Sequence, residues 1–262
     1  MRVPPGEGQL KLRIVAVVLA LSLAGCGGTT DTPAASSGSA GVTGTVNVFA
    51  AASLTESFTT LGKQFEAAHR GTTVKFNFAG SSALATQINQ GAPVDVFASA
   101  APKNMQAVTE AVAPVTFAKN QLVIAVAKGN PKAITGLSGL TAPGLKVALC
   151  AEAVPCGAAA KTALATSGVT LTPVTLEQDV KAALSKLKLG EVDAALVYRT
   201  DAKASAAEVD AVEFPESAKA INEYPIAVLK NAANAAGARA FADYVLSADG
   251  IAVLTAAGFQ AP

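Results

Sequence analysis

The stretch VFAAASLTES, residues 48–57, decides the fold because it joins the end of an apolar, β-rich run to the start of an amphipathic helix. Three alanines precede Ser53, and Glu56 follows that serine three places later. The spacing fits a capping box, in which the two side chains bond to free backbone N–H groups at a helix start. A capping box stabilises a helix start and by itself implies no binding function. A functional interpretation therefore requires that the pattern recur along the chain.

The same passage from strand to helix recurs along the chain. Residues 80–82 (GSS) follow the run VKFNFA, residues 155–157 (PCG) follow LKVAL, and residues 179–180 (DV) begin a fourth helical stretch. Because β-rich runs alternate with amphipathic helices, we predict an α/β architecture with mostly parallel sheets. Ligands bind at the carboxyl ends of the strands in such sheets. We therefore expect the four helix starts to converge on one ligand.

Helix starts favour an anionic ligand. Their free N–H groups and partial positive charge suit an oxyanion without any lysine or arginine. Micromolar affinity needs about 8 kcal/mol, and a hydrogen bond to a charged group contributes about 1.5–3 kcal/mol, so five or six donors are enough. A site of donors also disfavours hydrogen phosphate, whose proton needs an acceptor, although a serine hydroxyl can rotate to accept it.

Composition excludes several classes of function. The 262 residues are enough for two modest lobes. The chain has 20 Lys and Arg against 19 Asp and Glu, which leaves no basic footprint for nucleic acid. A serine hydrolase needs a base beside its nucleophile, and the single histidine, His69, lies at a polar helix end. We expect no catalytic residues, and a lipid-anchored adhesion module remains as an alternative.

The N-terminus has the pattern of an export signal. Basic Lys11 and Arg13 precede an apolar run over residues 14–25, which is too short to span a bilayer. We predict a signal peptide over residues 1–25. The closing residues LAGC resemble the lipobox of bacterial lipoproteins, which predicts a lipid on Cys26; an ordinary secretory signal is the alternative. Residues 26–43 are rich in Gly, Ser, Thr and Ala, so we predict a flexible tether there.

Two further cysteines stand six residues apart, Cys150 and Cys156. In an exported chain a disulfide is favoured over two free thiols. In the chain-entropy model, closing so short a loop contributes about 2–3 kcal/mol. A catalytic or metal-binding pair is the competing interpretation, but the CxxC spacing and a nearby histidine are both missing.

Six blocks of sequence, taken in order, resemble the molybdate-binding proteins that serve ATP-binding-cassette transporters. The blocks are VFAAASLTESF, FAGSSALATQINQGAPVDVFASA, VPCGAAAKTAL, LEQDVKAAL, GEVDAALVYRTDA and EYPIAVL. The resemblance covers about residues 46–259 and implies a type II periplasmic-binding-protein fold, with two lobes that close over molybdate or tungstate. We expect lobe 1 to hold residues 44–121 and 225–262, and lobe 2 to hold residues 122–224.

The resemblance also implies which residues contact the oxyanion. By position, Ser53 and Ser81 contribute hydroxyl and backbone N–H groups, Cys156 and Val180 contribute backbone N–H groups, and Tyr198 contributes its phenol. Many relatives have alanine in place of Cys156, so the family pattern gives the disulfide no role. We hypothesise that the disulfide stiffens the loop that presents the Cys156 N–H.

The partners follow from the resemblance as well. We expect an exported lipoprotein on the outer face of the bacterial cytoplasmic membrane, monomeric and without a cofactor, that carries a small oxyanion. It would deliver molybdate, and tungstate too, to a transmembrane permease driven by a cytoplasmic ATPase. A binding protein for another tetrahedral oxyanion such as sulfate is the alternative.

Overall fold

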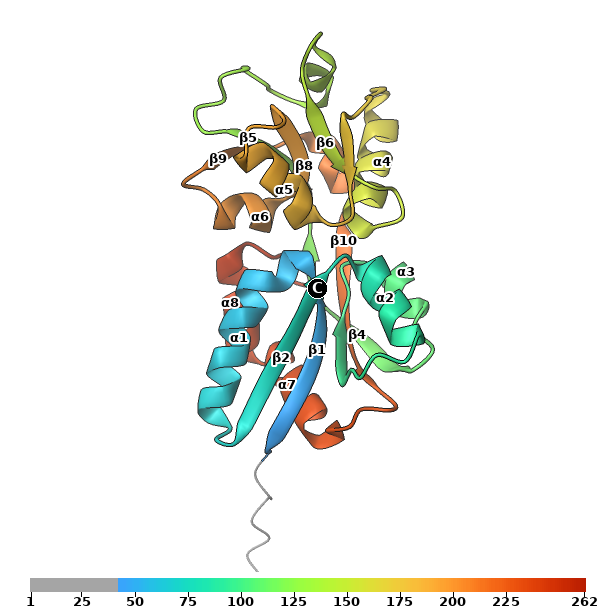
Figure 1. Cartoon of the computed structure of the whole chain (residues 1–262). Helices are drawn as coiled ribbons and strands as arrows, with labels where there is room; N and C mark the ends of the chain where they lie inside the picture. The colour runs from blue at the N-terminus through green and yellow to red at the C-terminus, as the bar shows by residue number, and fades with distance from the viewer. Residues whose placement is uncertain (1–41) are drawn as a thin grey trace, which may run out of the picture. The chain divides into compact units, whose positions relative to one another are not determined.

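A computed structural model describes residues 42–262, which fold into two β-sheets covered by helices (Figure 1). The predicted signal peptide, the Cys26 lipidation site and nearly all of the predicted tether lie outside the described residues. Between residues 42 and 262, no single helix is long and apolar enough to cross a membrane. The two C-terminal helices together pass that test of length and composition only as a pair bent by 60°.

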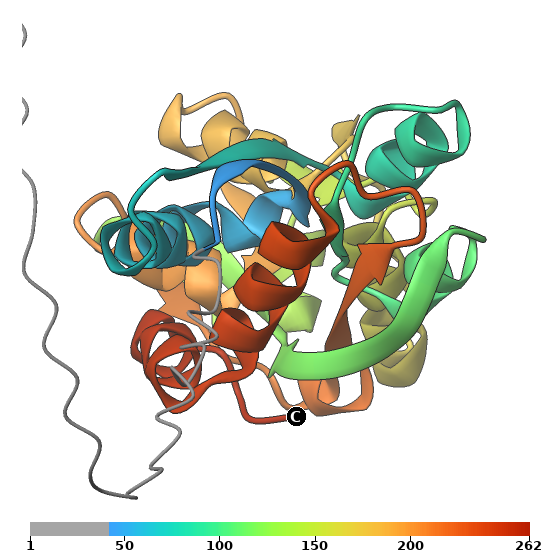
Figure 2. The same cartoon turned by 90° about the horizontal axis from the view of Figure 1, so that it is seen from below.

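The first sheet has the strand order β2-β1-β3-β10-β4 and, with the helices packed on it, forms what we call lobe 1. Its elements are β1 (Gly44–Ala51), η1 (Ala52–Leu54), α1 (Thr55–Ala68), β2 (Thr72–Ala79), α2 (Ser81–Asn89), β3 (Val96–Ala98), α3 (Pro102–Gln106), β4 (Ala111–Asn120), β10 (Asn222–Leu229), α7 (Ala235–Leu246) and α8 (Ala248–Ala257). Seen from below, α1 with α7 and α8 lies apart from α2 and α3 (Figure 2).

The alternation of side chains along each strand gives lobe 1 two cores. Val48 of β1 belongs to the cluster that includes Phe58 of α1 and Phe241 of α7. The next residue, Phe49, packs instead on the cluster around Leu84 of α2. Because successive strand residues point to opposite faces, one apolar run holds a helical layer on each side of the sheet.

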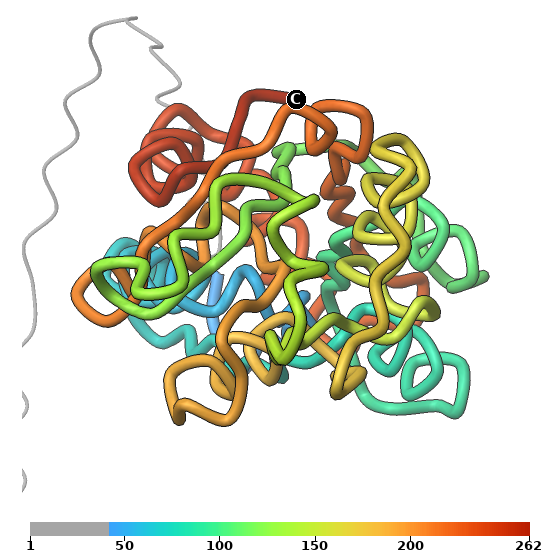
Figure 3. Tube along the Cα trace, turned by 90° about the horizontal axis from the view of Figure 1, so that it is seen from above, coloured from blue at the N-terminus to red at the C-terminus, as the bar shows by residue number. Residues whose placement is uncertain are grey.

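The second sheet has the order β7-β6-β8-β5-β9 and forms lobe 2 with its helices. Its elements are β5 (Leu122–Ala127), η2 (Leu137–Thr141), β6 (Val147–Cys150), α4 (Pro155–Ser167), β7 (Thr175–Glu177), α5 (Val180–Lys188), β8 (Ala194–Tyr198), α6 (Arg199–Ala204), β9 (Val209–Val212) and η3 (Pro215–Lys219). Helix α4 (yellow) lies along one side of this lobe in the view from above (Figure 3). One core cluster joins α4 and α5 to the strands.

Both sheets contain parallel and antiparallel pairs. Strand β1 pairs parallel with β2 and β3, and β6 does so with β7 and β8, while β10 and β5 each form two antiparallel pairs. The α/β architecture is therefore confirmed, and the predicted parallel order holds around β1 and β6. The chain changes sheet between Asn120 and Leu122 and returns before Asn222, three residues ahead of the return at residue 225 that the sequence predicts.

The local sequence pattern does not hold over residues 101–112. The run APKNMQAVTEAV, residues 101–112, has a helical pattern, but α3 ends at Gln106 and β4 begins at Ala111. Strand β4 pairs with β10, which lies about a hundred residues later in the chain. That pairing is non-local, so it overrides the local pattern.

Candidate anion-binding site

A small pocket lies between the two lobes at the ends of β1, β2 and β8. Its cavity volume is about 20 Å³, measured as the space open to the centre of a water-sized sphere, which is far below the usual range of about 300–1,000 Å³ for sites of drug-sized ligands. The pocket therefore fits a small ligand. The lining residues are Ala51, Ala52, Ser53, Ala79, Gly80, Ser81, Ala100, Val154, Pro155, Cys156, Asp179, Val180 and Tyr198. All five residues predicted to contact the ligand are among them.

Three α-helices begin at this pocket, and a 3₁₀ turn also lines it. Helix α2 begins at Ser81 in lobe 1, while α4 and α5 begin at Pro155 and Val180 in lobe 2. The N–H groups in a first helical turn have no acceptor within their own helix. Lobe 1 and lobe 2 thus both present backbone donors, with the positive ends of the helix dipoles, to the same small space.

Tyr198, at the end of β8, brings an unsatisfied donor to the pocket. Its side chain is 1% exposed, and its hydroxyl has no hydrogen-bond partner among the described residues. A buried polar group in that condition costs about 1–3 kcal/mol. Burial raises the pKa of Tyr198 well above its ordinary value, so the phenol keeps its proton. The phenol is therefore suited to donate to a bound acceptor.

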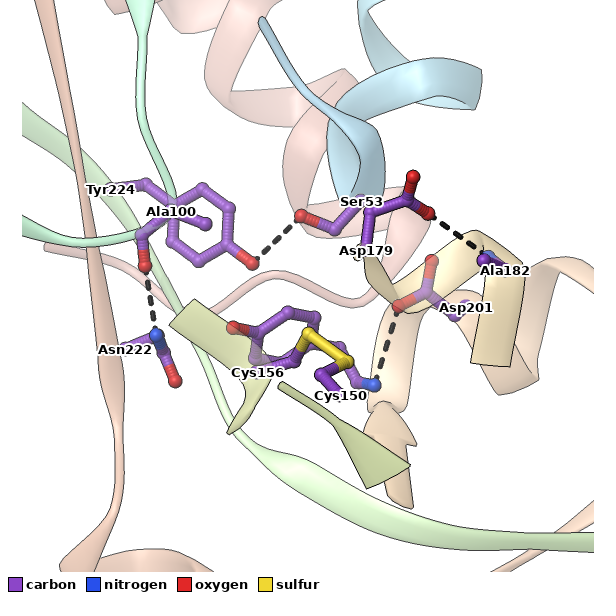
Figure 4. The surroundings of a disulfide bond; sticks show 10 residues. Ser53, Ala100, Cys150, Cys156, Asp179, Ala182, Asp201, Asn222 and Tyr224 are labelled. Atoms are coloured by element: carbon purple, nitrogen blue, oxygen red, sulfur yellow. Dashed lines mark hydrogen bonds between the residues drawn. A yellow bond between two sulfur atoms is a disulfide. The ribbon is translucent and has the colours of Figure 1, made fainter. Parts of the chain in front are cut away.

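The hydroxyl oxygen of each of the two predicted serines makes a hydrogen bond to another part of lobe 1. Ser53 Oγ lies 2.9 Å from the Tyr224 hydroxyl (Figure 4). Ser81 Oγ accepts the backbone N–H of Ala100 at 2.9 Å. The predicted capping box is wrong, because Ser53 lies inside the 3₁₀ turn η1 and neither η1 nor α1 has a side-chain cap. Ser53 therefore lines the pocket, and its hydroxyl does not cap a helix.

Among the described residues, no lysine, arginine or histidine lines the pocket. The one charged lining residue is Asp179, which caps α5 by accepting the Ala182 N–H at 2.9 Å (Figure 4). The Arg199 guanidinium is paired with Glu213 at 2.7 and 2.8 Å. Across residues 42–262, no cluster of three or more His, Cys, Asp or Glu side chains is placed to hold a metal ion. Uncharged donors are thus the main binding groups that the pocket offers.

Comparison with known proteins decides the family. The family model for bacterial extracellular solute-binding proteins matches residues 46–260. The chain belongs to this family. It is 43% identical over 258 residues to the molybdate-binding protein ModA of Mycobacterium tuberculosis H37Rv, covering 97% of this chain and 98% of that protein.

Solved structures of similar fold agree with this assignment. The periplasmic molybdate-binding protein of Azotobacter vinelandii has a TM-score of 0.72 at 22% identity, covering 83% of this chain and 99% of that one. The sulfate-binding protein SubI of M. tuberculosis H37Rv has a TM-score of 0.70 at 19% identity, covering 83% and 86%. At these identities the two structures support the two-lobe fold of the solute-binding protein and no finer conclusion.

A cluster of three charges links the lobes of the solute-binding protein beside the pocket. Lys181 Nζ lies 2.7 Å from the Glu56 carboxylate of lobe 1 and 2.9 Å from the buried Asp201 carboxylate of lobe 2. Burial lowers the pKa of Lys181, but the two carboxylates raise it overall. Burial raises the pKa of Asp201 to about 6, although Lys181 opposes the shift. The Lys181–Glu56 pair is a direct ionic contact between the lobes at this edge.

The raised pKa of Asp201 predicts a pH dependence of stability. Between about pH 4 and pH 6 the folded protein holds a proton on Asp201 that the unfolded chain releases, so the free energy of unfolding falls as pH rises through this window. We expect Asp201→Asn, which cannot ionise, to lose that component. Urea unfolding at several pH values compares the two proteins. Parallel pH profiles for wild type and variant would contradict the assignment.

The disulfide is present and lies next to the pocket. Cys150 ends β6, Cys156 stands in the first turn of α4, and the two sulfurs are bonded (Figure 4). Both side chains are buried. The bond closes a loop across a sequence separation of six, and Cys156 at the end of that loop lines the pocket. The geometry therefore allows the hypothesised stiffening of this loop.

Removing the disulfide is predicted to affect both stability and binding. The double substitution Cys150→Ala and Cys156→Ala should lower the free energy of unfolding by about 2–3 kcal/mol in the chain-entropy model. It should also weaken oxyanion binding, because the ligand must then order the loop. Urea unfolding and calorimetric titration measure the two effects. If both quantities equal those of the wild type, the hypothesis is wrong.

Sequence reasoning missed three features of the site. Tyr224 binds Ser53 from 171 positions away, and the Ala100 N–H orients Ser81 from a neighbouring strand end. Gly80 faces the opposite lobe, where a Cβ would overlap the Gln178 carbonyl oxygen. The sequence predicts a helix start at Gly80-Ser81, but no neighbouring residue in the sequence indicates any of these three contacts.

Proposed function

We propose that this solute-binding protein captures molybdate, and tungstate as well, and delivers it to an importer driven by ATP. The observation that carries the proposal is the buried, unsatisfied Tyr198 hydroxyl in a pocket where helix starts of both lobes meet and no basic side chain is present. Such a site matches a small dianion that carries no proton. The name of the M. tuberculosis relative supports molybdate as that ion.

The proposed contacts divide between the lobes. Ser53 and Ser81 of lobe 1 donate through hydroxyl and backbone N–H groups, while Cys156 and Val180 of lobe 2 donate backbone N–H groups and Tyr198 donates its phenol. These donors number more than the five or six that micromolar affinity needs at about 1.5–3 kcal/mol each. Because each lobe supplies part of the set, the bound ion links the lobes and shifts the population toward the closed form.

The proposal includes a place in the cell. Membership in an extracellular family supports export, and the lipobox-like LAGC motif supports an acyl anchor on Cys26 at the outer face of the cytoplasmic membrane. A monomer tethered by residues 26–43 would present the loaded lobes to a transmembrane permease, whose partner ATPase supplies the energy. We propose no enzymatic step, since a carrier needs only to bind and release its ion.

Sulfate is the second candidate ligand. The fold similarity to the sulfate-binding protein SubI keeps this alternative open, because sulfate is also a tetrahedral dianion. Size separates the two ions. A pocket shaped for the larger molybdate leaves some donors unpaired around sulfate, and unpaired buried donors reduce affinity.

Calorimetric titration with molybdate, tungstate, sulfate and phosphate tests the proposal. We expect tight binding of the first two ions and weak binding of the others, with a rise in melting temperature that follows the same order. Sulfate affinity equal to that for molybdate would support the alternative ligand. Absence of binding to all four ions would reject an oxyanion carrier.

A further inference from the structure

We propose that Lys181 is a positioning residue that latches the two lobes over the bound ion and so slows the release of that ion. This inference rests on the proposed function, because it concerns the same pocket. Lys181 is the second residue of α5 and directly follows Val180, whose N–H faces the ion in the proposed site. Lys181 does not line the pocket, so its ammonium acts on the lobes and not on the ion.

The Lys181 ammonium joins one carboxylate of each lobe. Its Nζ lies 2.7 Å from both carboxylate oxygens of Glu56, in the first turn of α1, and 2.9 Å from Oδ1 of Asp201 on α6. In Figure 1 the start of α1 lies below α5 and α6. The Lys181 side chain is 24% exposed and the Asp201 side chain is fully buried. Salt therefore screens this cluster less than it screens a pair on the open surface.

Asp201 fixes the ammonium within lobe 2. Its Oδ1 is buried and, apart from the Lys181 ammonium, has no polar partner among the described residues. A buried carboxylate without a countercharge is costly, so it keeps the ammonium in this place. Its Oδ2 accepts the Tyr198 backbone N–H at 3.3 Å. The ammonium is thus tied to Val180 along the chain and to Tyr198 through the buried carboxylate, and both residues contact the ion in the proposed site.

Opening the pocket must separate Lys181 from Glu56. Ser53 and Glu56 stand three residues apart in one continuous helical stretch, and Val180 and Lys181 are adjacent in α5. A movement that carries Val180 away from Ser53 therefore also carries the ammonium away from the Glu56 carboxylate. Because the ion pair forms only in the closed arrangement, it shifts the population toward that arrangement. The ion leaves when the lobes open, so the effect belongs to the dissociation rate.

The test is Glu56→Gln, with the release of radiolabelled molybdate followed in an excess of unlabelled molybdate. Glutamine keeps the size of this exposed side chain and removes its charge. We expect the dissociation rate to rise about two- to fivefold at low salt, and the difference from the wild type to shrink at high salt. The direction is diagnostic, because loss of a negative charge beside the pocket would by itself tighten the binding of an anion. A rate equal to or below that of the wild type would overturn the inference.

Two controls make the result specific. Glu191→Gln removes the same charge from the partner of Lys186, which also belongs to α5, but that ion pair lies within lobe 2, so the rate should stay as in the wild type. In a background of Lys181→Met with Asp201→Asn, which leaves no buried charge unpaired, Glu56→Gln should no longer raise the rate. A rise in that background would show that Glu56 does not act through Lys181.

The outcomes also separate this inference from the proposed function. Failure of the wild type to bind molybdate would reject the proposed function. Binding by the wild type with an unchanged dissociation rate in Glu56→Gln rejects only the latch.

Discussion

Replacing Gly80 with alanine is expected to weaken molybdate binding by about a hundredfold or more while leaving the ligand-free protein folded. Gly80 stands at the start of α2 in lobe 1, and a Cβ at that position would overlap the backbone carbonyl oxygen of Gln178 in lobe 2. Its φ of −58° is one that alanine adopts readily. The glycine is therefore required by the approach of the lobes and not by its backbone conformation.

The size of the effect follows from the donors that would be lost. Neither Gly80 nor the Gln178 carbonyl belongs to a flexible side chain, so the lobes must separate to admit a methyl group. If two donors of one lobe lose contact with the ion, at about 1.5–3 kcal/mol each, the affinity falls by at least about a hundredfold.

Calorimetry with molybdate and thermal unfolding without ligand together measure this prediction. Gly136→Ala is the matched control, because its φ of 174° is extended and no atom lies within 4 Å of the added Cβ. Wild-type affinity in Gly80→Ala would show that the lobes do not need this approach to hold the ion. A low melting temperature of the ligand-free variant would show that the glycine serves the fold instead.

The double substitution Ser53→Ala and Ser81→Ala is the second change with a large expected effect. Each serine supplies one hydroxyl donor in the proposed site, so losing both should cost about 3–6 kcal/mol of binding free energy. The backbone N–H groups of both residues remain, and binding should therefore weaken strongly without being abolished. Ser53→Ala also removes the hydrogen bond between the Ser53 and Tyr224 hydroxyls, which lowers the stability of the fold.

The matched control for the serines is Ser57→Ala. Ser57 is a buried serine of α1 whose hydroxyl donates to the Leu54 carbonyl, and it does not line the pocket. Titration with molybdate should give wild-type affinity for Ser57→Ala and a loss of several kcal/mol for the double variant. A loss below 1 kcal/mol in the double variant would mean that the hydroxyls do not contact the ion.

Local sequence pattern was enough to predict the helix starts that surround the pocket. Ser81, Cys156 and Val180 each follow an apolar strand or its loop, and their first-turn positions follow from Gly, Pro or Asp beside them. The resemblance then selected Tyr198, which by its apolar strand alone would be read as a core aromatic. The structure places these residues in one pocket, and their contact with an ion remains a proposal.

Long-range contacts explain what the sequence did not predict. Ser53 and Glu56 have the spacing of a capping box, yet Tyr224 and Lys181, both far along the chain, bind these side chains instead. The helical pattern of residues 101–112 holds only as far as Gln106, and from Ala111 the chain pairs as β4 with β10, about a hundred residues away. In each case a tertiary partner outweighed a local preference, and a single sequence does not identify that partner.

The central claim is that uncharged donors hold a dianion between the lobes without a basic side chain. Anomalous diffraction from crystals grown with molybdate tests it most directly, because the metal can be located independently of the protein. We predict one strong peak in the pocket, with Ser53, Ser81, Cys156, Val180 and Tyr198 around it and no lysine or arginine in contact. An empty pocket, or an ion held mainly by basic side chains, would contradict the claim.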